Sequence, residues 1–131
     1  MKNKKTVLIT GGAGLVGSAI KSVSESYEDY NFVYTQRKFH DLTNETDVAR
    51  MYAEVNPDYV IHTAARVGGI GRNLNSPAQQ FYENILMNSY LIHYAHLYDV
   101  EKFIAFSSVC VFPAGVPVIK ESILHDSPPR S

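Results

Sequence analysis

A glycine-rich turn near the amino terminus constrains the fold of this chain more than any other feature. Residues 6–17 read TVLITGGAGLVG, so an apolar run leads into glycines at positions 11, 12, 14 and 17. This spacing satisfies both G-x-G-x-x-G and G-x-x-G-x-x-G, which are typical of turns that bind the diphosphate of a dinucleotide. Glycine permits the tight turn, the close approach of the backbone to phosphate, and the close packing of helix on strand. The N–H groups at the start of the helix then hold the anion. An ordinary strand-to-helix loop is the alternative. The expected cofactor contacts from this turn are Gly11, Gly14, Leu15, Val16 and Gly17.

Strand and helix patterns alternate along the rest of the chain. Apolar residues recur at helical spacing after the glycine turn and again between Asn44 and Pro57. Asn44 is an expected N-cap, and Ser76 is expected to form a capping box with Gln79. The alternation predicts right-handed crossovers and an α/β fold of the Rossmann type, a doubly wound parallel sheet of about four strands. The expected strands are 6–10, 31–35, 58–63 and 103–106, and the expected helices are 14–26, about 45–56 and 76–99.

Composition excludes several functional classes. A chain of 131 residues is about one domain. A formal net charge of −1 gives no general attraction to nucleic acid or to a membrane surface. No apolar stretch approaches the ~20 residues of a membrane helix, and the run at 7–9 is too short for a secretory signal. Cys110 is the single cysteine, which excludes an internal disulfide and a multi-cysteine metal site. We expect a cytoplasmic protein without a nucleic-acid, membrane or metal partner.

The residues after the second expected strand indicate which dinucleotide is preferred. In NAD-binding Rossmann folds, an acidic residue about 20 positions beyond the glycines accepts the ribose hydroxyls. Residues 34–38 read YTQRK here, with two cations and no carboxylate. A 2′-phosphate is therefore favoured, and NADP is the expected cofactor, with Arg37 as the first phosphate ligand and Lys38 as the second. A solvated basic turn is the alternative interpretation.

Asp41 and Leu42 lie just before the second expected helix. At that position a carboxylate can accept a hydrogen bond from the adenine amino group, while a backbone N–H reaches a ring nitrogen. An aspartate near a helix start can equally serve as a cap. Both interpretations remain open.

Side chains with possible chemical roles follow the fourth expected strand. Residues 107–113 read SSVCVFP, at the carboxyl edge of a parallel sheet where a nicotinamide would lie. Ser108 could hydrogen-bond a substrate oxygen, and Cys110 could exchange a proton with a carbon beside a carbonyl. Serines and cysteines at strand ends are more often structural, so this pattern alone is modest support for catalysis.

Taken with other segments, this stretch resembles the GDP-L-fucose synthase family, which consists of 3,5-epimerase/4-reductases of the extended short-chain dehydrogenase/reductase type. The matching segments are GGAGLVGSAI at 11–20, AARVGGI at 64–70, Asn84, and SVCVFP at 108–113. The pairing of the second and fourth segments is much more specific than the glycines.

The resemblance implies conversion of GDP-4-dehydro-6-deoxy-D-mannose to GDP-L-fucose with NADPH. In the family, the serine matching Ser108 polarises the C4 carbonyl, and the cysteine matching Cys110 acts in epimerisation at C3 and C5. A C4 ketone acidifies the protons on C3 and C5. One residue that polarises the ketone and another that moves these protons are therefore chemically reasonable roles. The resemblance also implies a homodimer and a GDP-sugar substrate. Its further site residues are Ala64 and Ala65 at the cofactor, and Val67, Gly68 and Gly69 between nicotinamide and sugar, where a flexible loop is the alternative.

The family also carries a Tyr-x-x-x-Lys pair after this point, and no such pair follows Pro113 here. The tyrosine is expected a few residues past Ser131. The family's epimerase histidine, later strands and C-terminal substrate domain are also absent. We therefore expect residues 1–131 to be a partial NADP-binding domain, the N-terminal part of an enzyme, which by itself is unstable or self-associated and is inactive as a reductase.

Two other functions remain open. One is another sugar-nucleotide epimerase or dehydratase of the extended short-chain dehydrogenase type, which would retain NAD. The other is a non-catalytic NADP-binding module, which would be indifferent to replacement of Cys110.

Overall fold

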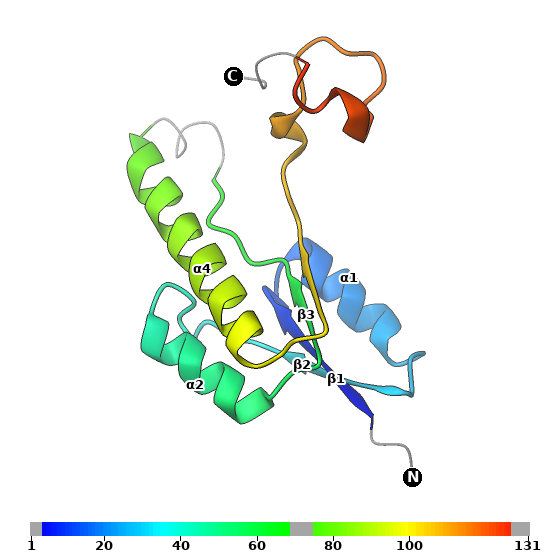
Figure 1. Ribbon diagram of the computed structural model, residues 1–131, viewed down its shortest axis with the longest axis vertical. Helices are drawn as coiled ribbons and strands as arrows, with labels where there is room; N and C mark the ends of the chain where they lie inside the picture. The colour runs from blue at the N-terminus through cyan, green and yellow to red at the C-terminus, as the bar shows by residue number, and fades with distance from the viewer. Residues whose placement is uncertain (1–3, 69–74, 127–131) are drawn as a thin grey trace.

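The protein is a three-layer α/β structure in a computed structural model that describes residues 4–68 and 75–126. Its four strands are all parallel and lie in the order β2-β1-β3-β4. Helix α1 covers one face of the sheet, and α2 and α4 cover the other (Figure 1). The strands are β1 (Lys5–Thr10), β2 (Tyr30–Tyr34), β3 (Tyr59–His62) and β4 (Lys102–Ala105). The helices are α1 (Leu15–Ser24), α2 (Glu45–Val55) and α4 (Pro77–Leu97), followed by the 3₁₀ turns η1 (Val109–Val111) and η2 (Glu121–Ile123).

This architecture confirms the expected Rossmann-type fold. Every expected strand and helix is present among the described residues, with ends that lie within two positions of the sequence-based ranges. The differences lie at the terminal turns, where hydrogen bonding frays and pattern is least informative.

The starts of α2 and α4 differ in how they are capped. Asn44 caps α2 as expected, since its side chain accepts a hydrogen bond from the Asp47 N–H at 3.2 Å. The capping box expected at α4 is wrong, because Ser76 makes no side-chain capping bond. The Gln79 side chain instead donates to Glu83 at 2.9 Å, so it does not reach back to the helix start.

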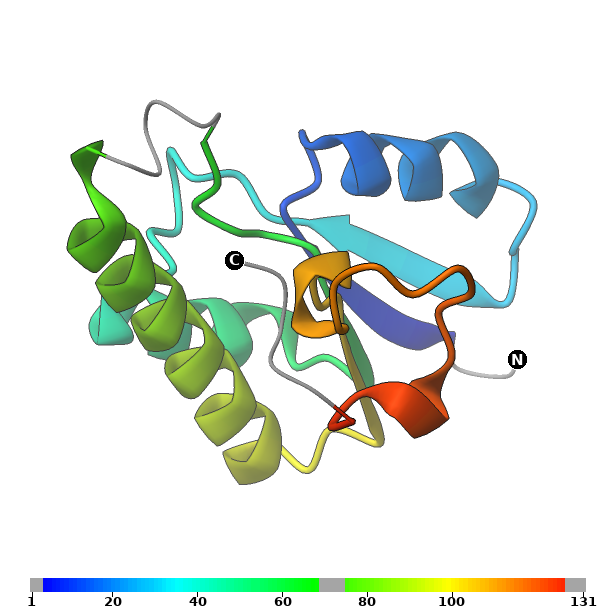
Figure 2. The same cartoon turned by 90° about the horizontal axis from the view of Figure 1, so that it is seen from above.

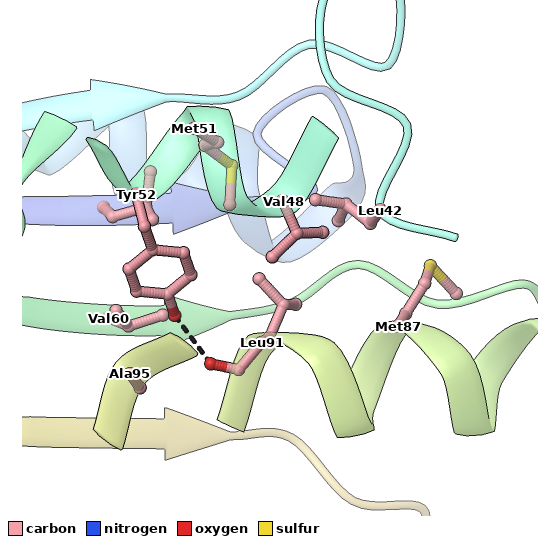
Figure 3. Packing of buried hydrophobic residues seen from close by; sticks show 9 residues of the cluster. Leu42, Val48, Met51, Tyr52, Val60, Met87, Leu91 and Ala95 are labelled. Carbon is pink, nitrogen blue, oxygen red and sulfur yellow. Dashed lines mark hydrogen bonds between the residues drawn. The ribbon is translucent and has the colours of Figure 1, made fainter. Parts of the chain in front are cut away.

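The main core lies between the sheet and the pair α2 and α4. Tyr52 is fully buried there, and its hydroxyl donates to the Leu91 carbonyl at 2.8 Å, which ties α2 to α4 (Figure 3). Burial raises the pKa of the Tyr52 phenol well above its ordinary value. The buried cluster consists of Leu8, Leu42, Val48, Met51, Tyr52, Val60, Met87, Leu91 and Ala95.

Residues 106–126 leave the carboxyl end of β4 and run above the sheet, with η1 lying over the strand ends (Figure 2). Within residues 4–68 and 75–126, no helix combines the length and apolar character needed to cross a bilayer.

Candidate functional site

A cavity of about 920 Å³ opens at the carboxyl ends of the strands. Its walls come from the glycine turn, the end of β2, the turn before α2, the loop after β3, and Phe106 and Ser107 after β4. Clefts of this size at this edge of a doubly wound sheet are where α/β proteins bind their ligands. The sequence-predicted residues that line it are Gly11, Gly14, Leu15, Val16, Arg37, Asp41, Leu42, Ala64, Ala65 and Val67.

The glycine turn is built so tightly that side chains would not fit. Gly11 has φ +74°, and a Cβ on it would lie 2.6 Å from the Ala64 backbone nitrogen. Gly17 is buried and does not line the cavity, but a Cβ there would overlap the Gly11 carbonyl oxygen. Gly14 occupies the N-cap of α1 without a side chain to cap it. The first N–H groups of the helix have no intrahelical acceptors, so the turn presents donors suited to a phosphate.

The two basic residues predicted for the 2′-phosphate lie differently. Arg37 lines the cavity and forms no ion pair with the described residues. Lys38 is not among the lining residues, and its Nζ lies 5.5 Å from the centre of the Phe39 ring.

Asp41 is held by the turn that precedes α2. Its Oδ1 accepts hydrogen bonds from the Thr43 hydroxyl at 2.7 Å and the Thr43 N–H at 3.0 Å. These bonds, with the charges of Arg37 and Arg66 adding to them, keep the pKa of Asp41 below its ordinary value. Asn44 is the N-cap of α2, so Asp41 caps a turn rather than the helix. Asp41 Oδ2 accepts no hydrogen bond from the part of the chain that the structure describes, so it remains available to an adenine amino group.

The loop after β3 is clamped by α4. Asn84 Oδ1 accepts from the Arg66 N–H at 2.8 Å, and Asn84 Nδ2 donates to the Arg66 carbonyl at 2.9 Å. The Arg66 guanidinium pairs with Glu83, and the pKa of Glu83 is lowered by its bond from Gln79 and by Arg66. Arg66 lines the cavity although sequence reasoning assigned it no role. The only signal in the local sequence was that Arg66 stands between Ala65 and Val67, which were both expected at the site.

His62 ends β3 in a buried polar network. Its Nδ1 lies 2.6 Å from the Thr10 hydroxyl, and its Nε2 lies 2.8 Å from Asn88 Oδ1. Burial lowers the pKa of His62, opposed by the bond to Asn88, so the neutral ring is favoured. Neutral His62 then donates through Nε2 and accepts from Thr10. This network joins β1, β3 and α4 directly beneath the cavity, which His62 also lines.

Ser108 and Cys110 lie just beyond the cavity wall that ends at Ser107, and neither lines it. Ser108 is the N-cap of η1, and its Oγ accepts from the Cys110 N–H at 3.1 Å. Because the hydroxyl oxygen accepts that bond, its proton remains free to donate elsewhere. Cys110 is exposed.

Of the two glycines expected in the loop after β3, Gly68 does not line the cavity, and Gly69 falls outside the described residues.

Tyr-x-x-x-Lys spacings do occur earlier in the chain, at Tyr34 with Lys38 and at Tyr98 with Lys102. The first pair begins at the last residue of β2. The second joins the end of α4 to the start of β4, at the amino edge of the sheet. Neither pair follows Ser108, so neither occupies the position expected of a catalytic pair.

Comparison with known proteins places nearly the whole chain in one family. Residues 7–131 match the NAD dependent epimerase/dehydratase family. The chain is 37% identical over 129 residues to a probable GDP-L-fucose synthase of Drosophila melanogaster, covering 96% of this chain and 40% of that protein. It is 36% identical over 125 residues to the GDP-L-fucose synthase of Escherichia coli K12, covering 94% of this chain and 39% of that protein.

Solved structures agree with these sequence matches. A GDP-L-fucose synthetase from Naegleria fowleri bound to NADP superposes with a TM-score of 0.85 at 30% identity, over 99% of this chain and 39% of that one. A GDP-mannoheptose C4 reductase from Campylobacter jejuni with NADP bound superposes with a TM-score of 0.86 at 29% identity, over 96% of this chain and 40% of that one. The chain thus spans about two fifths of the length of the relatives it matches.

Proposed function

The chain belongs to the NAD dependent epimerase/dehydratase family, and on that premise we propose that it is the NADP-binding part of a GDP-L-fucose synthase-like enzyme. The proposed reaction inverts C3 and C5 of GDP-4-dehydro-6-deoxy-D-mannose and reduces C4 with NADPH, giving GDP-L-fucose. Residues 1–131 are then part of the NADP-binding domain, and the substrate domain comes from outside them. The observation that carries the proposal is one cavity that runs from the glycine turn to Ser107.

The residues around that cavity suit a dinucleotide phosphate. A Cβ at Gly11 or Gly17 would fill the phosphate turn, which is the pattern expected where backbone must approach a ligand closely. In the proposal, the N–H groups at the start of α1 hold the diphosphate, Asp41 and Leu42 bind adenine, and Arg37 binds the 2′-phosphate. Bound NADPH supplies the hydride. Ala64 and Ala65 form the wall beside it.

Ser108 and Cys110 carry the sugar chemistry in this proposal. The Ser108 proton, left free by the bond from the Cys110 N–H, donates to the C4 carbonyl oxygen. Polarising that carbonyl acidifies the protons on C3 and C5, so Cys110 can take one as a thiolate. A partner acid on the opposite sugar face returns a proton and completes the inversion. Val67, Gly68 and Gly69 shape the wall between sugar and nicotinamide.

We also propose a cytoplasmic homodimer that pairs through α4. Phe81, Ile85 and Ile92 are 71%, 47% and 55% exposed, and their spacing places them along one side of the helix. Large exposed apolar patches are typical of interaction sites, which supports pairing through this helix.

The proposal is tested on the protein expressed from its complete coding sequence. The GDP-keto sugar is first incubated in heavy water without NADPH, and deuterium entering C3 and C5 is measured by mass spectrometry. NADPH oxidation is then followed separately. We expect Cys110→Ser to abolish deuterium exchange. Ser108→Ala should lower kcat by about 10²–10³, the usual cost of removing one donor to a developing oxyanion.

Ser22→Ala is the matched control, because the Ser22 hydroxyl only donates to the Ala19 carbonyl on exposed α1. It should retain full exchange and reduction. Normal exchange in Cys110→Ser would contradict the catalytic roles and favour a binding module. Turnover of a different sugar nucleotide with tightly held NAD would favour the other epimerases or dehydratases. Robust reduction by residues 1–131 alone would contradict the prediction that this part is inactive by itself.

A further inference from the structure

Two cations from different elements line the cavity of the candidate site. Lys21 comes from the last turn of α1, and Arg37 comes from the turn after β2. None of the ion pairs among the described residues includes either side chain. We infer that Lys21 is the second cation of the 2′-phosphate subsite and so helps determine the preference for NADP over NAD. This inference rests on the proposed function.

The Tyr34 ring places Lys21 beside this subsite. Lys21 Nζ lies 5.8 Å from the centre of that ring. Tyr34 is the last residue of β2, and a Cβ on Gly12 would lie 3.0 Å from its Cδ1. The ring therefore packs between the phosphate turn and α1. In a Rossmann fold the adenine ribose lies at the end of the second strand, directly beside the phosphate turn. The flexible Lys21 side chain is thus anchored next to the ribose 2′ position.

Arg37 lines the same cavity from the turn that follows β2, together with Gln36 and Asp41. Lys21 lines it from α1. The two cations therefore reach the cavity from different elements, and a phosphate bound at the end of β2 can contact both.

The charge of the ligand calls for such a pair. A phosphate monoester carries about −1.5 to −2 charges at neutral pH, which one guanidinium does not balance. Lys38, the second candidate from sequence, lies against Phe39 and does not line the cavity. Lys21 does line it, although it lies far from Arg37 in sequence.

Lys21 also has a structural role that the test must separate. A cation in the last turn of a helix interacts favourably with the partial negative charge of its carboxyl end. Loss of that interaction lowers stability but changes the affinities for NADPH and NADH together. The ratio of the two dissociation constants is therefore the informative quantity.

The experiment measures both dissociation constants by calorimetry, on the protein expressed from its complete coding sequence. We expect Lys21→Met to weaken NADPH binding by about tenfold, the usual size of one charge-assisted hydrogen bond, with NADH affinity within about twofold of wild type. Lys21→Arg should restore the preference. Lys102→Met removes an exposed lysine at the amino end of β4 and is the matched control, expected to change neither constant.

Each other outcome overturns the inference. An unchanged ratio in Lys21→Met, or equal losses for both cofactors, removes Lys21 from the subsite. A selective loss in Lys38→Met with none in Lys21→Met assigns the second cation to Lys38. A wild type that binds NADH as tightly as NADPH overturns the proposed cofactor itself. That failure is distinct, because the other failures leave the wild-type preference for NADPH intact.

Discussion

The glycine turn has no space for side chains where α1 packs against it, because a Cβ at Gly11 or Gly17 would overlap neighbouring backbone atoms. The glycine spacing in the sequence predicted this backbone requirement. Lys21 and Arg66 were not predicted, because their positions depend on Tyr34 and Asn84, which lie far away in sequence. The local sequence pattern reveals where the backbone requires glycine, whereas the placement of side chains depends on tertiary contacts.

Gly17→Ala tests the packing requirement. At an exposed site within a helix this change stabilises by about 1 kcal/mol. Here the new Cβ would lie 2.6 Å from Gly12 Cα and overlap the Gly11 carbonyl. We expect the free energy of unfolding to fall by about 1–3 kcal/mol, the usual cost of overpacking, in denaturant titrations.

Gly14→Ala is the comparison, because its nearest contact would be the Gly11 carbonyl oxygen at 3.2 Å. Its loss should be clearly smaller. A gain in stability from Gly17→Ala would show that the helix does not press on the turn.

The periodicity of the sequence predicted the type and the approximate ends of each helix and strand. It predicted the capping of only one of the two helices considered. Asn44 and Ser76 both precede helices and look similar as sequence signals. Ser76 has φ −146° and ψ 49°, outside the extended conformation that Asn44 adopts, and its expected partner Gln79 is engaged by Glu83. The Gln79–Glu83–Arg66 contacts that produce this difference link α4 to a loop distant in sequence, so no local motif could reveal them.

The two caps give a matched pair of variants. Asn44→Ala removes the bond to the Asp47 N–H and should cost about 1 kcal/mol of unfolding free energy. Ser76→Ala removes no side-chain capping bond and should change stability by less than about 0.5 kcal/mol. Chemical denaturation of both variants measures the difference. Equal losses would contradict the capping assigned here.

For the whole molecule, alternating patterns predicted a doubly wound parallel sheet, and the structure has one with β4 at an edge. A hollow of about 480 Å³ lies between α1 and the sheet and is lined in part by the exposed side chains of Val23 and Ile104. The charges at the amino end of the sheet were not predicted. Lys5 on β1 pairs with Asp58 at 2.9 Å and with Glu101, and so connects residues that flank β3 and β4.

This network predicts acid sensitivity. The pKa of Asp58 is lowered by the Thr6 N–H and by Lys5, and that of Glu101 by Lys5 and Tyr59. Both carboxyls are thus more acidic in the folded protein than in the unfolded chain, where their ordinary values are 3.8 and 4.5. Their stabilising contribution is complete above those values and is lost as pH falls through the lowered folded values.

Thermal unfolding across this pH range measures the effect. The midpoint should fall as the solution is acidified below about pH 4.5, and the fall should be smaller in Asp58→Asn. Glu28→Gln removes an exposed carboxyl that forms no ion pair with the described residues, and it should leave the pH profile unchanged. An identical pH profile in Asp58→Asn would contradict a role for this network.

The most direct test of the proposed site is a crystal structure of the protein, expressed from its complete coding sequence, with NADPH bound. We expect the diphosphate on the N–H groups at the start of α1, the 2′-phosphate in contact with Lys21 and Arg37, and the nicotinamide beside Ser107, with Ser108 and Cys110 facing the space next to it. A cofactor bound elsewhere, or a nicotinamide remote from Ser108 and Cys110, would contradict it.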